Sequence, residues 1–327
     1  MFFSKFSGKY DDNLTIFSAP ICGFTRFPFR QILKNTPLDL IYTEMVSIDA
    51  LFYHNPHTLP LLRFEEASVS TGAQVFGSKP DLFIFAADKL FQMGFSTLDI
   101  NCGCPVKKVI KSEAGSFLLT NPEKIYQIIS QLKNRFPDKA ISAKIRLGYN
   151  HENQNYLEIA RAIEESKADW LTVHGRTRPQ MYEGEINYEA IQAIKARCSL
   201  PVIGNGNIFT PEDAKKMWEL TGCDAIMLAR GLLGNPWLPS QIRDFMRSGH
   251  YHHPTITDKL EMLKTNLRLE LDFDPRGGFR EFKKIGVKYL KNIPGASSLR
   301  KTLMSAPTQN EMLAELALLE RELNSSS

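Results

Sequence analysis

The sequence lacks the features that mark secreted, membrane-spanning and zinc-binding proteins. It has only five cysteines, an odd number with no paired spacing, which is typical of a chain kept in a reducing compartment. The first residues contain no apolar core of a signal peptide, and no apolar run approaches the roughly 18 residues that cross a bilayer. Cys102 and Cys104 have no second Cys or His pair at ligand spacing, so zinc is not expected. We therefore expect a soluble cytoplasmic protein with no metal, no membrane contact and no obligate protein partner.

The chain also lacks a dinucleotide-binding fingerprint. No G-x-G-x-x-G follows the first predicted strand, where the chain has Ala19-Pro20-Ile21-Cys22-Gly23, and Gly204-Asn205-Gly206 has no third glycine. This absence disfavours a doubly wound sheet, the structural alternative for a chain of alternating strands and helices.

What the sequence does contain is an eightfold alternation of short apolar runs and amphipathic segments. The predicted strands are Thr15–Ala19, Leu40–Thr43, Gly72–Phe76, Thr97–Asn101, Ile141–Ile145, Trp170–His174, Pro201–Gly204 and Ala225–Leu228. The helices predicted between them include Pro80–Met93, Pro122–Arg135, Tyr156–Lys167, Tyr188–Arg197 and Pro211–Leu220. We expect an α/β fold, a (β/α)8 TIM barrel, over residues 1–247.

The strand pattern stops near residue 250. Residues 254–327 predict only helices, at Thr257–Phe273, Gly278–Asn292, Ser298–Met304 and Gln309–Leu323, with a turn at Pro294-Gly295-Ala296. We expect a C-terminal all-helical domain, joined to the barrel by residues 250–254.

The positive charge is concentrated in this second part. Residues 276–301 carry eight basic residues against one acidic residue, although the whole chain has a net charge of +4. At helical spacing one face of the segment is basic (Arg280, Lys283, Lys284, Lys288, Lys291) and the opposite face is apolar (Phe279, Phe282, Ile285, Tyr289, Ile293). The alternative is an ordinary solvated helix, but acids rarely balance these bases, which favours contact with a phosphate backbone.

The carboxyl ends of the strands in a barrel meet at one mouth, where active sites form. The residues predicted there are Pro20, Ile21, Cys22, Gln74, Asn101, Lys144, Arg146, His174, Asn205, Gly206, Asn207, Ala229 and Arg230. The glycine-containing loops after the seventh and eighth strands are typical of phosphate binding. An inward lysine, an amide and a phosphate cup together suit a flavin, although Lys144 could also form a Schiff base and His174 could be a core imidazole.

The loop after the fourth strand carries the best candidate for chemistry. Leu98–Asn101 leads directly into Cys102-Gly103-Cys104-Pro105, and the basic residues Lys107, Lys108 and Lys111 follow. Cys104 is placed to act as an acid or a nucleophile, whereas Cys102 could equally be a small apolar filler.

Together these segments resemble the bacterial tRNA-dihydrouridine synthase family over nearly the whole chain. The resemblance rests on Ala19-Pro20, Gly23-Phe24-Thr25, Pro28-Phe29-Arg30, Thr43-Glu44-Met45, Gln74–Gly77, Asn101–Lys108, Ala114-Gly115-Ser116, Lys144–Gly148, Val173–Thr177, Pro201–Asn207, Gly222–Ala225, Ala229–Gly231, Lys288-Tyr289-Leu290 and Pro294-Gly295-Ala296. Two departures occur, Cys102 before Gly103 and Ile21-Cys22 after Pro20, and both alter the expected pocket wall slightly.

The resemblance implies a flavin-dependent enzyme that reduces a uridine of the tRNA D-loop. FMN would contact Pro20, Ile21, Cys22, Gln74, Lys144, His174, Asn205, Gly206, Asn207, Ala229 and Arg230; Cys104 would donate the proton; Asn101 and Arg146 would approach the target base. Arg280, Lys283, Lys284 and Lys288 would bind tRNA, and NADPH or NADH would reduce the flavin. Two alternatives are a dihydroorotate-dehydrogenase-like barrel acting on a free pyrimidine and a barrel that only binds RNA.

Overall fold

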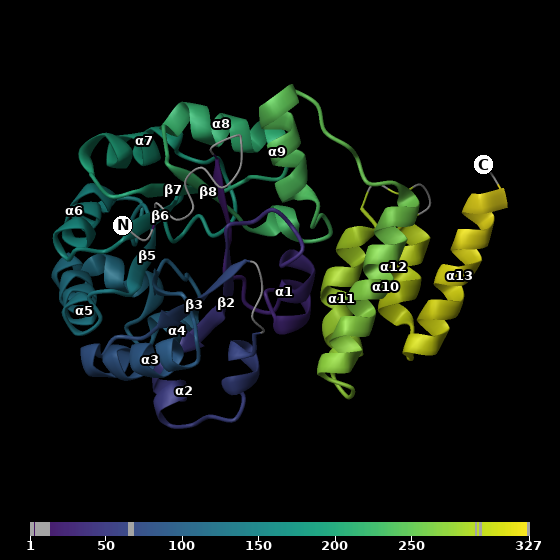
Figure 1. Ribbon diagram of the computed structural model, residues 1–327, viewed down its shortest axis with the longest axis horizontal. Coiled ribbons are helices and arrows are strands. Elements are labelled where there is room, and N and C mark those ends of the chain that lie inside the picture. Colours follow the sequence, from purple (N-terminus) through teal and green to yellow (C-terminus); the bar gives the residue numbers. More distant parts are fainter. Residues whose placement is uncertain (1–2, 4–13, 65–68, 292, 294–295, 326–327) are drawn as a thin grey trace.

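The protein forms a closed barrel of eight parallel strands beside a group of C-terminal helices (Figure 1). The computed structural model describes residues 3, 14–64, 69–291, 293 and 296–325. The strands are β1 (Thr15–Ser18), β2 (Leu40–Ser47), β3 (Ser70–Phe76), β4 (Thr97–Cys102), β5 (Ala140–Arg146), β6 (Trp170–His174), β7 (Val202–Asn205) and β8 (Ala225–Leu228). They lie in sequence order, and β1 pairs with β8 to close the barrel.

Helices cover the outside of the barrel, and further helices come after the barrel in the sequence. The helices up to residue 248 are α1 (Phe27–Leu33), α2 (Ile48–Phe52), α3 (Pro80–Gln92), α4 (Lys107–Ile110), α5 (Pro122–Arg135), α6 (Tyr156–Glu165), α7 (Tyr188–Arg197), α8 (Pro211–Thr221) and α9 (Leu238–Ser248), with short 3-10 helices η2 (Leu59–Leu62), η3 (Gly115–Thr120) and η4 (Arg230–Leu232). The remaining helices are α10 (Ile256–Phe273), α11 (Gly278–Tyr289), α12 (Ala296–Ser305) and α13 (Gln309–Ser325). Among the described residues, no helix is long and apolar enough to cross a membrane.

The predicted barrel with C-terminal helices is confirmed, with differences in some boundaries. Strand β2 continues to Ser47 because its pairing with β3 shifts register between Tyr42 and Met45 and then resumes. Helix α11 ends at Tyr289, so Lys291 lies beyond it. The short helices α1, α2 and α4 and helix α9 were not predicted. Asn292 and the predicted turn at Pro294 and Gly295 lie outside the described residues.

The inside of the barrel changes from apolar to polar along its axis. At the amino-terminal end of the strands, the rings of Phe3, Phe17 and Trp170 pack with centroids 6.0–6.2 Å apart. Successive side chains of a strand point to opposite faces, so the polar residues at alternate positions of β4, Thr97, Asp99 and Asn101, share one face. The polar face continues to the mouth.

Three aspartates secure the amino-terminal ends of the strands. Asp39, Asp169 and Asp224 each immediately precede a strand and accept the backbone N–H of a residue on the preceding strand, at 2.7–2.8 Å. Each also binds a basic side chain, Arg243, Lys133 and Lys195 respectively. These carboxylates satisfy strand-end donors that the ladder leaves unpaired, and they fix this end of the barrel.

The C-terminal helices attach to the barrel through α1 and the loop after β8. The rings of Phe27 and Phe273 lie 5.5 Å apart, centroid to centroid, between α1 and α10. Gly234 has a positive φ of 82°, and a Cβ added there would lie 2.4 Å from the Lys288 carbonyl oxygen of α11. Only glycine allows this close approach.

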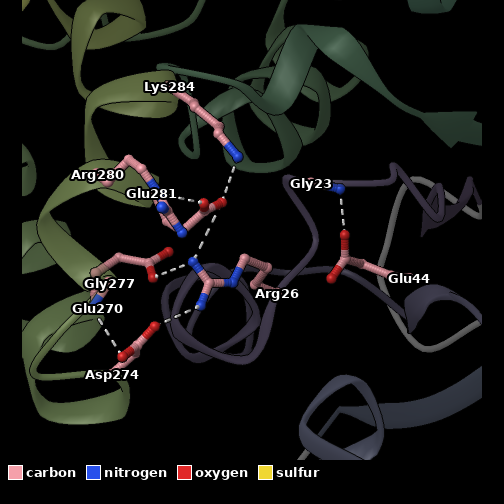
Figure 2. A network of polar contacts seen from close by, with 9 residues as sticks. All are labelled: Gly23, Arg26, Glu44, Glu270, Asp274, Gly277, Arg280, Glu281 and Lys284. Atoms are coloured by element: carbon pink, nitrogen blue, oxygen red, sulfur yellow. Dashed lines mark hydrogen bonds and ion pairs between the residues drawn. The ribbon is translucent and has the colours of Figure 1, made fainter. Parts of the chain in front are cut away.

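An arginine of the barrel lies among carboxylates of the helical part at this junction (Figure 2). The Arg26 guanidinium is 3.0 Å from Glu270, 3.6 Å from Glu281 and 4.0 Å from Asp274. Burial of Glu270 raises the pKa of its carboxyl group to about 7, although Arg26 opposes the shift. This raised pKa makes the junction sensitive to pH.

We predict that Glu270→Gln raises thermal stability relative to wild type, by an amount that grows as the pH rises. Between about pH 4.5 and pH 7 the folded state keeps a proton on Glu270 that the unfolded chain has released, so wild type loses stability as the pH rises through this window. Glutamine cannot ionise and keeps a polar oxygen beside Arg26. Melting temperatures from pH 5 to pH 8 should show the difference widening by a few degrees.

Glu261→Gln, at an exposed carboxylate of the same helix, is the control and should show no such widening. A constant difference between wild type and Glu270→Gln across this pH range would contradict the raised pKa.

Candidate active site

The predicted site residues gather at the carboxyl ends of the strands. The strand registers place Asn101 beside Lys144, Arg146 beside His174, and His174 beside Asn205. Because paired residues on neighbouring parallel strands face the same side, these side chains share one mouth. The loops after β1 and β8 add Pro20–Cys22 and Ala229–Arg230.

The loop that carries Cys104 is held from several sides. Asn101 Oδ1 accepts the backbone N–H groups of Gly103 at 3.1 Å and Cys104 at 2.9 Å. The Ser116 N–H donates to the Cys104 carbonyl at 3.1 Å. Gly115, with φ of 62°, lies so near that an added Cβ would be 2.9 Å from the same carbonyl oxygen. The position of Cys104 is therefore fixed by its backbone.

The environment of the Cys104 thiol keeps it protonated. The residue is 9% exposed, and this burial raises the pKa of the thiol above its ordinary value. The Val106 N–H and the Arg146 guanidinium oppose the shift because both stabilise the thiolate. At neutral pH Cys104 is a thiol, the form that donates a proton, and groups that stabilise its conjugate base lie beside it.

The other two mouth cysteines differ from it. Cys102 is fully buried in the apolar layer outside the barrel, where burial raises the pKa of its thiol far above the usual range. Its position matches that of a small apolar filler. Cys22 is exposed on the loop after β1. Burial of its thiol atom and the nearby Glu44 raise the pKa of Cys22 as well.

A chain of polar side chains lies beneath the Cys104 loop. Gln74 Nε2 donates to Asp99 Oδ2 at 2.7 Å, and Asn101 Nδ2 donates to Gln74 Oε1 at 2.7 Å. Ser142 Oγ donates to the other oxygen of Asp99 at 2.6 Å. Sequence analysis missed Asp99, although its inward position two residues before Asn101 in a buried strand was a usable signal.

Lys144 reaches the mouth from β5. Its Nζ donates to Asn205 Oδ1 at 3.0 Å, and Asn205 Nδ2 in turn donates to the Met227 carbonyl at 2.7 Å. Burial and the charge of Arg146 lower the pKa of Lys144 to about 8, partly offset by Asp99. Lys144 is therefore a cation held in place by an amide, with no carboxylate in direct contact among the described side chains.

Arg146 connects two loops of the mouth. It is 3% exposed, and its guanidinium donates to the carbonyls of Gly103 at 2.9 Å, Thr177 at 2.9 Å and Met181 at 2.7 Å. The structure shows that Arg146 ties the Cys104 loop to the loop after β6. Its expected approach to the target base stays a prediction.

The loops after β6, β7 and β8 form a cationic cradle. Gly206 has a φ of 131°, and a Cβ there would lie 2.3 Å from Ile186. Asn207 also has a positive φ, and its Oδ1 accepts from Arg176 at 3.1 Å and Arg230 at 3.3 Å. The Arg230 guanidinium also lies over the rings of Tyr182 and Phe209. Sequence analysis did not select Arg176, which lies only two residues beyond His174.

The charges of this region repel one another. His174 is buried, and burial together with Arg146, Lys144, Arg176 and Arg230 lowers the pKa of its imidazole well below the ordinary value. His174 is therefore neutral at pH 7. Within the described part of the chain, none of these four cations forms a salt bridge. Such an uncompensated cluster suits an anionic ligand.

The loop after β1 supplies an apolar side of the mouth. Its turn is closed by the Thr25 N–H donating to the Ile21 carbonyl and by Thr25 Oγ1 accepting the Ile21 N–H. Ile21 and Ala229 are half-buried and pack on the apolar cluster that fills the barrel below. Pro20 precedes this turn and is also half-buried. Together these groups offer an apolar surface to a ligand in the mouth.

The four basic residues predicted on α11 do not share one environment. Arg280 and Lys288 are exposed, and Lys284 is 47% exposed while it binds Glu281 at 2.5 Å. Lys283 differs, because its Nζ donates to the carbonyls of Met304 and Ala306 at the end of α12. The expectation that Lys283 faces outward with the others is wrong, since this side chain binds the next helix.

The chain matches the family model "Dihydrouridine synthase (Dus)" over residues 17–324. It is 33% identical to tRNA-dihydrouridine synthase B of Pasteurella multocida, over 97% of this chain and 98% of that protein. It is 32% identical to tRNA-dihydrouridine synthase B of Escherichia coli K12, over 94% and 97%. An old yellow enzyme homologue from Zymomonas mobilis shares the fold, with a TM-score of 0.52, 14% identity, and coverage of 77% of this chain and 94% of that chain. The family match and these identities show that the protein belongs to the dihydrouridine synthase family.

Proposed function

We propose that the protein is a cytoplasmic tRNA-dihydrouridine synthase. It reduces the C5–C6 double bond of a uridine in the D-loop of tRNA, with bound FMN, with NADPH or NADH as reductant, and with Cys104 as proton donor. The names of its relatives support the reaction. The observation that carries the proposal is a protonated Cys104 thiol, fixed by its backbone in a mouth whose cations form no salt bridge among the described residues.

The residues of the mouth fit FMN. The cradle formed by Gly206, Asn207, Arg176 and Arg230 offers charge and backbone room for a phosphate. Ile21 and Ala229 offer an apolar surface for the ring, and Lys144 offers a cation held by Asn205. When bound, FMN supplies the hydride that a nicotinamide donor has given to it.

The protein's contribution to the reduction is the proton. A uracil that gains hydride at C6 develops negative charge at C5, and the Cys104 thiol neutralises that charge by donating its proton there. The Val106 N–H and Arg146 then stabilise the thiolate that remains. Lys144 places positive charge in the same mouth and stabilises an electron-rich ring.

Besides reducing the uridine, the protein must bind the tRNA that carries it. Turning a stacked or paired uridine out of folded tRNA costs a few kcal/mol, which contacts to the backbone phosphates must offset. Exposed basic groups are available on both parts of the protein. They are Lys107, Lys108 and Lys111 after the Cys104 loop and Arg280, Lys284 and Lys288 on α11. The charge of Lys284 partly opposes the rise in the pKa of Cys22 that burial and Glu44 cause, so α11 lies near the loop after β1 at the mouth.

We predict that Cys104→Ala retains flavin and tRNA binding but forms dihydrouridine at least about 100-fold more slowly, since a general acid contributes about 10² to 10⁴ in rate. Dihydrouridine in the tRNA is measured after single turnover with pre-reduced enzyme. Cys198→Ala, the same substitution at a buried cysteine at the end of α7, is the control. Formation of dihydrouridine by Cys104→Ala at the wild-type rate would show that another group is the acid.

We predict that neutralising Arg280 and Lys288 together, as glutamines, weakens tRNA binding without lowering the flavin content. Each lost phosphate contact lowers the slope of log affinity against log salt by about 0.7 to 0.9. Titrations at several salt concentrations measure this slope. Arg161→Gln with Lys215→Gln removes two exposed charges from α6 and α8 and is the matched control. Equal slopes for the two double variants would contradict a role of α11 in RNA binding.

A further inference from the structure

A buried carboxylate that no proposed step uses lies below the catalytic loop. Asp99 is fully buried in β4, where its two oxygens accept from Gln74 and Ser142. Within the described part of the chain it forms no salt bridge. A buried carboxylate is costly, and burial raises the pKa of Asp99 to about 6. Its presence needs a physical reason.

The reason follows from the donors and acceptors of the two amides above it. An ionised carboxylate only accepts hydrogen bonds, so it selects the NH₂ end of Gln74, which donates at 2.7 Å. The carbonyl end of Gln74 then faces Asn101 and accepts from its NH₂ end, also at 2.7 Å. This leaves Asn101 Oδ1 facing the Cys104 loop, where an acceptor is required.

The final link is the loop itself. Asn101 Oδ1 accepts two backbone N–H groups, from Gly103 and Cys104. If the Asn101 amide were reversed, its NH₂ group would face these two donors and both hydrogen bonds would be lost. An amide can rotate between two orientations of similar shape, so something must select one. Asp99, Gln74 and Asn101 form a series of hydrogen-bonded side chains that leads to the Cys104 loop. In this series only the ionised Asp99 carboxylate has no donor, so only Asp99 can select one orientation.

Resting on the proposed function, we infer that Asp99 is a positioning residue: through Gln74 and Asn101 it sets the orientation of the Cys104 loop and so holds the thiol where it protonates the uracil. The series passes from β4 to β3 and back to β4, and all of its side chains are buried. Buried, fully paired networks of this kind specify one arrangement.

The test compares three substitutions that share the same buried layer. Asp99→Leu keeps the branched arrangement of side-chain heavy atoms and removes the acceptor, so both amides lose their selected orientation. Asp99→Asn retains one oxygen that can accept from Gln74, and should restore a large part of the rate lost in Asp99→Leu. Ser142→Ala removes the other hydrogen bond to Asp99 and leaves the series to Cys104 intact.

Two half-reactions separate positioning from general damage. We expect Asp99→Leu to slow reoxidation of the reduced flavin by tRNA about 10- to 100-fold, the cost of misplacing a reacting group by an ångström or less. Reduction of the bound flavin by NADPH should stay within about twofold of wild type, since Cys104 takes no part in it. Both rates are measured per bound flavin, because Gln74 is itself expected to contact FMN. Equal slowing of both half-reactions would overturn the inference.

A double-variant cycle tests whether the effect passes through Cys104. In a Cys104→Ala background, Asp99→Leu should add little further loss, because the group that it positions is already absent. A full additional loss in that background would assign Asp99 an independent, structural role and overturn the inference.

A measurement without RNA separates this inference from the proposed function. Iodoacetamide modification of Cys104, followed by peptide mass spectrometry, should be about tenfold faster in Asp99→Leu than in Ser142→Ala, because a loosened loop exposes the thiol more often. If wild type fails to reduce tRNA while this difference persists, the proposed function fails and the positioning role stands. Equal modification rates in the two variants would overturn the positioning role itself.

Discussion

The pair of hydrogen bonds from Gly103 and Cys104 to Asn101 Oδ1 is the constraint on which the site depends. A thiol is useful as an acid only when its distance and direction to the substrate are fixed, and a loop at a strand end does not provide this by itself. The barrel supplies it because β3, β4 and β5 are locked in register, so the side chains below the loop cannot move independently. Arg146 ties the same loop from β5.

Charge is distributed in opposite ways at the two functional regions. Four cations lie at the mouth: Lys144, Arg146, Arg176 and Arg230. The charge of Arg146 lowers the pKa of Lys144, and all four charges lower the pKa of His174. An anion bound among them would offset this repulsion. At the junction with the helical part, Arg26 faces three carboxylates. The first arrangement is complete only with a ligand, whereas the second is satisfied within the chain and holds the two parts together.

The sequence predicted the parts of this protein that repeat with a regular period. Eight apolar runs, with helices that begin at Asn121-Pro122 and Thr210-Pro211, were enough to predict the barrel and the mouth residues. The sequence did not show which partners each polar side chain binds. Arg146 was assigned to the target base by resemblance and Lys283 to RNA by charge, yet both also donate to backbone carbonyls whose positions depend on tertiary packing. Asp99 was missed for the same reason, since its role exists only once β3 lies beside β4.

Under the proposed function, the placement of α11 would link RNA binding to the chemistry. Close contact between Gly234 and the Lys288 backbone sets α11 against the loop after β8, which also carries Arg230 of the cradle. Lys284 at the same time lies near Cys22 on the loop after β1. The helix that offers exposed positive charge is therefore built onto the rim of the mouth rather than joined to it by a free linker. If Arg280 and Lys288 hold a phosphate backbone, as the proposed function requires, the packing of α11 keeps that backbone at a fixed offset from Cys104, and the offset would decide which nucleotide can enter.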